Sequence, residues 1–179
     1  GGMNYTKLHG QTYLKLVLFN YMINNTDYGP TGNAKEGDMR NIDTIQNEET
    51  KAIFPVAYDF DQAEIITKPN MRKGEEGQIH NSVLEGDQAL KLCYRWSDVN
   101  AWHPYFNNIK QSLLDKIAHY GKATYTKPIA NAKGHKTFYY LNKSEVASMT
   151  AASKHFYAMW DNGELQTVVN NTWERNNCR

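Results

Sequence analysis

Cysteine is scarce in this chain of 179 residues, since Cys93 and Cys178 are the only two. Small domains that depend on disulfides carry many cysteines, and zinc sites use short Cys or His pairs. Cys93 falls in a predicted strand and Cys178 is the penultimate residue, so neither a disulfide framework nor a zinc site is predicted. We therefore expect a protein of a reducing compartment.

The chain also lacks a long apolar run. The first such run, residues 13–22, is interrupted by Lys15 and Asn20, whereas a membrane-spanning helix needs about 20 apolar residues. No small-residue cleavage site marks this run as a secretory signal. It is interpreted as a core helix, and the sequence predicts a cytoplasmic protein with no membrane partner.

Motifs that carry enzyme chemistry by themselves are missing. The segment Gly29–Gly32 lacks the spacing and the lysine of a glycine-rich phosphate loop. The six histidines form no short pair of metal ligands, and nothing marks a Ser-His-Asp or Cys-His triad. These absences favour a protein that binds over one that catalyses, with no cofactor.

Composition indicates a soluble globular protein, predicted as a single domain over residues 3–179. Gly1 and Gly2 precede Met3 and are interpreted as residues left by cloning. Hydrophobic residues make up 40% and charged residues 22% of the chain, which excludes wholesale disorder. Asparagine, lysine, tyrosine and isoleucine are frequent. This bias is typical of AT-rich genomes such as those of bacterial viruses, so we expect an origin in a phage or another mobile element.

Charge is unevenly distributed, although the formal net charge is only +1. Residues 36–87 hold twelve acidic and five basic side chains, and residues 110–154 hold eight lysines and two acidic side chains. A fold that separates these segments gives an electrostatically two-faced molecule. A fold that interleaves them cancels the difference, and the sequence leaves both outcomes open.

Periodic apolar residues predict four helices, each with a stripe at the three- and four-residue spacing of one helix face. The first spans residues 11–25, and the last two span residues 144–161 and 164–176. The second is capped by Ser97, Asp98 or Asn100, has Pro104 in its first turn and carries its apolar stripe over residues 106–120. Gly29 and Pro30 are predicted to stop the first helix, Gly121 the second and Gly163 the third.

One buried strand and two hairpins are predicted between these helices. The strand covers residues 52–58, where Pro55 indicates an edge strand or a bulge. One hairpin joins residues 79–84 to 89–96, and the other joins 123–130 to 136–141. The polar segment Thr31–Thr50 is predicted as a long contact loop. Together these elements predict an α+β fold, with an antiparallel or mixed central sheet packed by N-terminal, middle and C-terminal helices.

Asp59 and Asp61 follow the predicted strand and are candidate metal ligands. Side chains alternate along a strand, so both carboxylates point to one face, where Mg²⁺ or Mn²⁺ would relieve their repulsion. Residues 58–62 resemble the nucleophile motif of haloacid dehalogenase-like phosphatases, and the Asp-x-Asp is similar to that of primase-type polymerases; both imply metal-dependent phosphoryl transfer. Ala63 replaces the usual Thr, and no matching downstream Lys or acidic motif follows. The alternative is a solvated strand end with Phe60 buried.

The second hairpin is rich in lysine and aromatic residues. Its candidate nucleic-acid-binding residues are Tyr125, Lys127, Lys133, His135, Lys136 and Tyr139. Single-stranded nucleic acid is bound by cations that contact phosphates and by exposed rings that stack on bases. In the alternative interpretation, Phe138 and Tyr140 are core residues and the lysines protect an edge strand from aggregation.

Three functions are consistent with the sequence. The preferred one is a non-enzymatic binding protein that contacts a protein or single-stranded nucleic-acid partner through the hairpin and the long polar loop. The alternative is a Mg²⁺- or Mn²⁺-dependent phosphoryl-transfer or nuclease-type enzyme centred on Asp59 and Asp61. The third is a structural or assembly subunit with exposed Tyr and Trp contacts. The sequence predicts no oligomeric state.

Overall fold

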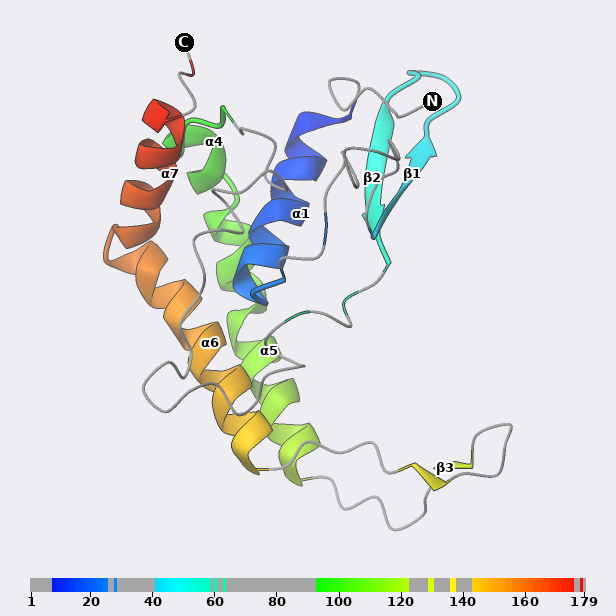
Figure 1. Ribbon diagram of the computed structural model, residues 1–179, viewed down its shortest axis with the longest axis vertical. Helices are drawn as coiled ribbons and strands as arrows, with labels where there is room; N and C mark the ends of the chain where they lie inside the picture. The colour runs from blue at the N-terminus through cyan, green and yellow to red at the C-terminus, as the bar shows by residue number, and fades with distance from the viewer. Residues whose placement is uncertain are drawn as a thin grey trace.

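A computed structural model of the protein describes residues 8–25, 28, 41–58, 60, 63, 93–122, 129–130, 136–137, 143–175 and 178 (Figure 1). Its helices are α1 (Gly10–Met22), α4 (Trp96–Asn100), α5 (His103–Lys122), α6 (Lys143–Asp161) and α7 (Glu164–Arg175). Its strands are β1 (Ile42–Gln46), β2 (Ile53–Ala57), β3 (Ile129–Ala130) and β4 (Lys136–Thr137). The α+β class that the sequence predicts is confirmed.

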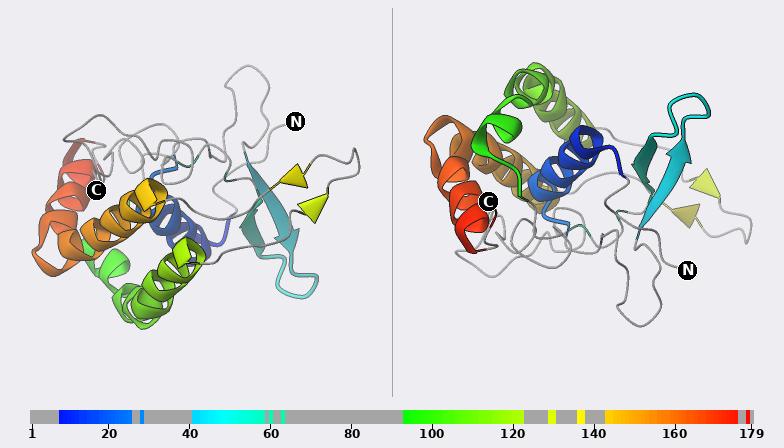
Figure 2. Two further views of the ribbon diagram at one scale, coloured as in Figure 1. Left: turned by 90° about the horizontal axis from the view of Figure 1, so that it is seen from below. Right: turned by 90° about the horizontal axis from the view of Figure 1, so that it is seen from above.

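Helix α1 is the central element of the described residues. Helices α5, α6 and α7 lie along one side of it, and the ribbon of β1 and β2 lies on the other (Figure 2). Because both sides are covered, Val17, Leu18 and Tyr21 have no exposed surface. The β1–β2 sheet therefore borders the helical core, and its strands present one face to α1.

The end of α1 is determined by two asparagines. Asn24 has a positive φ of 53°, a left-handed conformation that Asn tolerates better than most residues. The Asn24 N–H donates to the Tyr21 carbonyl and the Asn25 N–H to the Asn20 carbonyl, which is the hydrogen-bond pattern of a Schellman cap. The helix therefore ends before Gly29 and Pro30, the residues that the sequence analysis expected to stop it.

Helices α5 and α6 form an antiparallel pair and have 20 and 19 residues. Phe106 of α5 packs against Phe156 of α6, with ring centroids 5.5 Å apart. The Tyr157 hydroxyl donates to the Phe106 carbonyl at 3.0 Å. Gly163, with a φ of 82°, separates α6 from α7 as predicted. No helix in the described ranges is both long and apolar enough to cross a membrane.

Strands β1 and β2 pair antiparallel, from Ile42 opposite Ala57 to Gln46 opposite Ile53. The predicted strand over residues 52–58 is confirmed, and Pro55 is tolerated because a two-stranded ribbon has only edge strands. The prediction that Thr31–Thr50 is one irregular loop was wrong, since β1 lies within it. Its polar sequence hid a short strand with only one buried side chain, that of Ile42.

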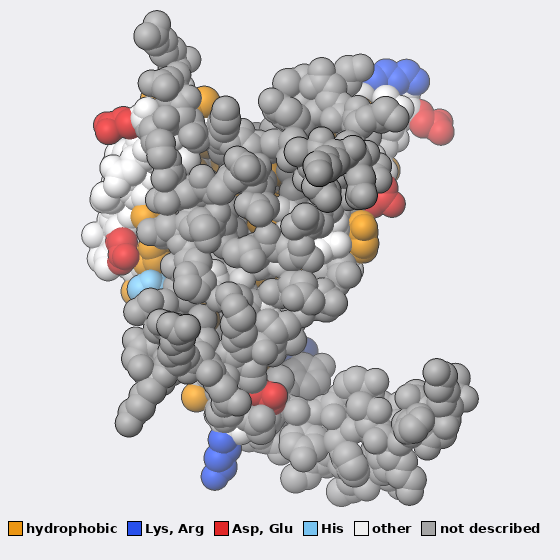
Figure 3. All heavy atoms as spheres, viewed as in Figure 1, with side chains coloured by type: hydrophobic (Ala, Val, Ile, Leu, Met, Phe, Trp, Pro, Cys, Tyr) orange, Lys and Arg blue, Asp and Glu red, His pale blue; other side chains and the backbone are white. Residues whose placement is uncertain are grey.

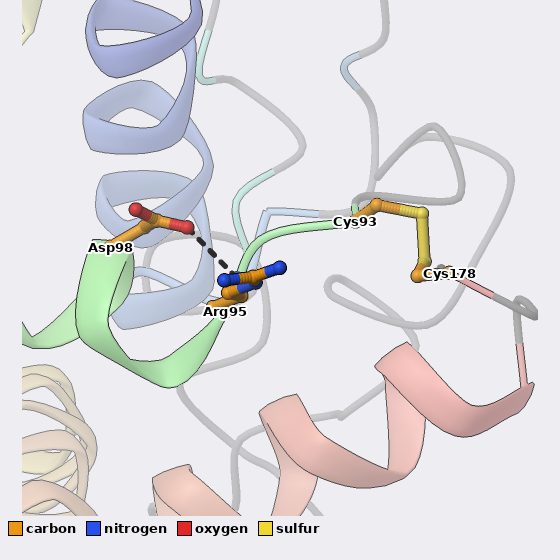
Figure 4. The surroundings of a disulfide bond; sticks show 4 residues. All are labelled: Cys93, Arg95, Asp98 and Cys178. Carbon is orange, nitrogen blue, oxygen red and sulfur yellow. Dashed lines mark hydrogen bonds between the residues drawn. A yellow bond between two sulfur atoms is a disulfide. The ribbon is translucent and has the colours of Figure 1, made fainter.

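The prediction of no disulfide was also wrong. Cys93 and Cys178 are 85 positions apart and form a disulfide bond with a Cα–Cα distance of 5.3 Å (Figure 4). Cys93 precedes α4 and belongs to no strand, and Trp96, predicted to end a strand, begins that helix instead. The Asp98 carboxylate explains the change, because it accepts the Arg95 N–H at 3.0 Å and so stabilises the first turn of α4.

Candidate functional site

The structure describes two paired positions of the lysine-rich hairpin. β3 and β4 pair antiparallel, with Ile129 opposite Thr137 and Ala130 opposite Lys136, so the predicted hairpin is confirmed over these residues. The two strands lie beyond the ends of α5 and α6, apart from the helices (Figure 1). Of the six candidate nucleic-acid-binding residues, only Lys136 is described, through its backbone. The other five lie outside the described residues: Tyr125, Lys127, Lys133, His135 and Tyr139.

The helices that carry this hairpin are joined at their far ends by an ionic cluster. Asp161, the last residue of α6, lies 3.7 Å from the His103 Nε2 and 3.8 Å from the Lys110 Nζ. The Lys110 ammonium also lies 4.9 Å from the centroid of the Tyr157 ring. The Trp160 indole N–H donates to the Asn100 Oδ1 at 3.1 Å. These contacts connect α4 and the first half of α5 to the end of α6, while the opposite ends of α5 and α6 lead into the hairpin.

Charged side chains of both signs are scattered over the face that Figure 3 shows. On the β1–β2 ribbon, Asp43, Glu48 and Glu49 are exposed close in sequence to Lys51. On α5 and α6, the basic Lys110 lies beside the acidic Asp161. In the part of the chain that is described, opposite charges are therefore neighbours. These neighbours do not pair the acidic segment 36–87 with the basic segment 110–154, so both arrangements of the two segments stay open.

The two candidate metal ligands, Asp59 and Asp61, lie outside the described residues, but their neighbours are placed. Phe60 packs against Phe19 of α1 with ring centroids 5.5 Å apart, and Tyr58 is exposed. The described residues contain no group of three or more His, Cys, Asp or Glu side chains that could hold a metal ion. The metal site therefore stays a prediction from the sequence.

Burial raises the pKa of several tyrosine hydroxyls in the core. Desolvation raises the pKa of Tyr157 to about 12. The pKa of Tyr94 is also raised to about 12, first by desolvation and then by the nearby Asp98 carboxylate. For Tyr13 and Tyr28, burial raises the pKa well above the ordinary value of 10. These groups stay neutral at physiological pH, so they bring no charge into the core.

A groove that sequence reasoning missed lies between α1, β2 and α5. It has a volume of about 240 Å³, and Phe19, Pro55 and Ile109 contribute to its apolar walls. Lys15 of α1 and Tyr105 of α5 also line it, with the Lys15 Nζ 3.7 Å from the centroid of the Tyr105 ring. The signal for this feature was the charged residue within the apolar run of residues 13–22, but its ring partner Tyr105 lies about 90 positions later in the chain.

Comparison with known proteins yields no relative. No protein-family model matches the chain, and no curated protein or solved structure matches it at a significant level. The similarity of residues 58–62 to phosphatase and polymerase motifs therefore stays a local resemblance. Any function must be argued from the residues themselves.

Proposed function

We propose that the protein is a non-enzymatic binding protein whose lysine-rich hairpin contacts single-stranded nucleic acid. The observation that supports this proposal is that β3 and β4, among the described strands, pair with each other alone and lie apart from the helical core (Figure 1). Segments that contribute to a core are normally held against it by packed side chains. The proposal is that the basic and aromatic residues of this segment serve a partner and not the core.

The chemistry of the hairpin segment fits such a partner. Residues 123–142 contain three lysines, one histidine and four aromatic side chains, and no acidic residue. Lysines neutralise phosphates in a salt-dependent manner. Stacking of one base on an aromatic ring contributes about 1–3 kcal/mol, so two or three rings give measurable affinity.

A charge-reversal variant tests the proposal. We expect the protein to bind a labelled oligothymidine of about 20 nucleotides at low salt, and Lys133→Glu/Lys136→Glu to weaken this binding. The matched control is Lys51→Glu/Lys154→Glu, which makes the same change in net charge at exposed lysines on the β1–β2 turn and on α6. An equal loss of affinity in both variants would show that the effect comes from net charge alone. Absence of binding by the wild type would refute the proposal.

A second pair of variants separates stacking from charge. Tyr125→Ala and Tyr139→Ala should each weaken oligothymidine binding by about 1–3 kcal/mol if the rings stack on bases. Binding of duplex DNA should be weaker than binding of the single strand, because paired bases do not expose their faces. Unchanged affinity in both variants would mean that the rings do not stack on bases and that only the lysines contact the phosphates. Such purely ionic binding would favour an acidic protein as the partner.

The cytoplasmic location predicted from the sequence stays part of the proposal, and the Cys93–Cys178 disulfide opposes it. Disulfides persist mainly in oxidising compartments and are rare in the cytosol. Acid quenching of producing cells followed by alkylation reports the state of both thiols. Free thiols agree with a cytoplasmic protein that oxidises after isolation, whereas a disulfide in the quenched cells indicates an oxidising compartment.

An assembly subunit is a second candidate, favoured by the outer face of the β1–β2 ribbon. Ile45 and Tyr58 are each 62% exposed and Val56 is 39% exposed, and strand alternation places all three on the face that points away from α1. Contacts between two copies would cover this face. A monomer by light scattering at high concentration would remove this candidate, while self-association abolished by Ile45→Lys would support it.

A further inference from the structure

We propose that the groove between α1, β2 and α5 binds a small apolar monocarboxylate, with Lys15 as the partner of the carboxylate. Described side chains from all three elements line the groove. Its volume of about 240 Å³ lies just below the range of about 300–1,000 Å³ that is usual for drug-sized ligands. It therefore suits a medium-chain aliphatic acid and excludes a large cofactor.

Lys15 is half-buried in this groove, where its ammonium contacts two aromatic rings. Its ammonium lies 3.7 Å from the Tyr105 ring centroid and 5.4 Å from that of Trp102. The faces of aromatic rings attract a cation but leave its charge uncompensated. No Asp or Glu of the described residues lies within ion-pair distance of Lys15.

Lys110 shows what a structurally satisfied lysine looks like in the same protein. Its ammonium also lies over a ring, that of Tyr157, at 4.9 Å. In addition, the Asp161 carboxylate lies 3.8 Å from it. Lys15 has the ring contact without the carboxylate, so the missing anion is the component that a ligand would supply.

The ring platform under Lys15 is held in place before any ligand binds. The Trp102 indole N–H donates to the Gln11 Oε1 at 3.1 Å. The Trp102 and Tyr105 rings meet edge to face, with centroids 5.8 Å apart and planes at 89°. Preorganised contacts lower the entropic cost of binding, which makes this lysine a better anion partner than a mobile surface lysine.

A single ammonium beside apolar walls indicates the class of ligand. One positive charge matches one carboxylate, whereas phosphate groups are usually bound by several donors. Phe19, Pro55 and Ile109 would contact the hydrocarbon portion of the ligand, which gains free energy by leaving water. An aliphatic monocarboxylate satisfies both parts of the groove.

Calorimetric titration of the full chain with decanoate, decanol and decylamine tests the inference. We expect saturable binding of decanoate at least roughly tenfold tighter than that of decanol, because a hydrogen bond to a charged group outweighs a neutral one. Decylamine should bind weakest, since like charges repel. Equal binding of decanoate and decanol, or no saturable binding of decanoate, would overturn the inference.

Lys15→Met tests whether this lysine provides the preference. It keeps the chain length and apolar contacts, and it should bind decanoate and decanol alike. Lys15→Arg keeps the charge and should retain the preference for decanoate. Lys110→Met is the matched control, because it removes a ring-stacked lysine outside the groove and should bind as the wild type does.

Amide chemical shifts of the wild type give a readout that needs no variant. On titration with decanoate, the amides of Lys15, Tyr105 and Ile109 should shift most. Shifts confined to amides outside the groove would contradict the assignment of the site. A Lys15→Met protein that still prefers decanoate to decanol would contradict it as well.

Discussion

Two buried tyrosines differ in whether their hydroxyl has a partner. Tyr157 donates to the Phe106 carbonyl at 3.0 Å, whereas the Tyr28 hydroxyl has no hydrogen-bond partner among the residues that the structure describes. Tyr28 is only 1% exposed, so its hydroxyl loses water without compensation. An unsatisfied buried polar group costs about 1–3 kcal/mol.

Replacement of each tyrosine by phenylalanine should therefore act in opposite directions. Tyr28→Phe should raise the free energy of unfolding by about 1 kcal/mol or leave it unchanged, and Tyr157→Phe should lower it by about 0.5–1.5 kcal/mol. Urea unfolding followed by circular dichroism measures both. A Tyr28→Phe protein destabilised as much as Tyr157→Phe would show that the Tyr28 hydroxyl has a partner in solution.

The same burial predicts a loss of stability at alkaline pH. The pKa values of Tyr94 and Tyr157 are raised to about 12 in the folded protein, while an unfolded tyrosine titrates near 10. The folded state therefore holds these protons more tightly than the unfolded state. This contribution to stability is fully present below about pH 10 and is lost as the pH rises from about 10 to about 12.

Thermal melts between about pH 9 and about pH 11 measure this loss. The melting temperature should fall as the pH rises, and the buried tyrosines should ionise together with unfolding. The Tyr157→Phe variant removes one of the groups and should lose less stability over the same interval. A melting temperature that rises with pH in this range would contradict the assigned burial of these tyrosines.

At the scale of the elements, one covalent bond holds α7 to α4. The disulfide joins Cys93, just before α4, to Cys178, just after α7. The Arg95 guanidinium lies 5.6 Å from the Trp173 ring centroid beside it. A disulfide that closes a long loop stabilises mainly by restricting the unfolded chain, typically by about 2–4 kcal/mol.

Removal of this bond should lower the melting temperature without changing the fold. We expect Cys93→Ser/Cys178→Ser to melt roughly 4–16 °C below the wild type. A reductant should lower the melting temperature of the wild type toward that of the variant and leave the melting temperature of the variant unchanged. Two free thiols in the oxidised wild type, detected by alkylation and mass spectrometry, would disprove the pairing.

The elements that could be predicted from sequence are those with a repeated local pattern. Helices α1, α5, α6 and α7 follow from apolar spacing, and β2 follows from its apolar run. β1 was missed because Ile42 is its only buried side chain, so no alternation marks it. Trp96 was assigned to a strand because alternation continued through it, but local capping by Asp98 was the stronger signal.

Features that depend on tertiary contacts could not be predicted. Two cysteines 85 positions apart give no pairing signal, because the distance between them is decided by how α4 packs against α7. Lys15 likewise looked like an interruption of a core helix. Its ring partners, Trp102 and Tyr105, become neighbours only when α5 packs beside α1.

At the scale of the whole molecule, a packed helical core lies apart from the hairpin of β3 and β4. The core is held by α1 and by the α5–α6 pair, and the hairpin lies beyond the helix ends (Figure 1). Lys133→Glu/Lys136→Glu should therefore leave the melting temperature within about 1–2 °C of the wild type, since surface changes usually alter stability by less than about 0.5 kcal/mol. A large drop would mean that these lysines support the fold.

The salt dependence of oligothymidine binding tests the central claim most directly. Fluorescence anisotropy over a range of KCl concentrations gives the slope of log K against log salt, which is about 0.7 for each phosphate that the protein neutralises on a single strand. We predict that Lys133→Glu/Lys136→Glu reduces the magnitude of this slope by about 1.4, for two lost contacts, while Lys51→Glu/Lys154→Glu keeps the wild-type slope. Identical slopes in all three proteins, or no binding by the wild type at low salt, would contradict the account.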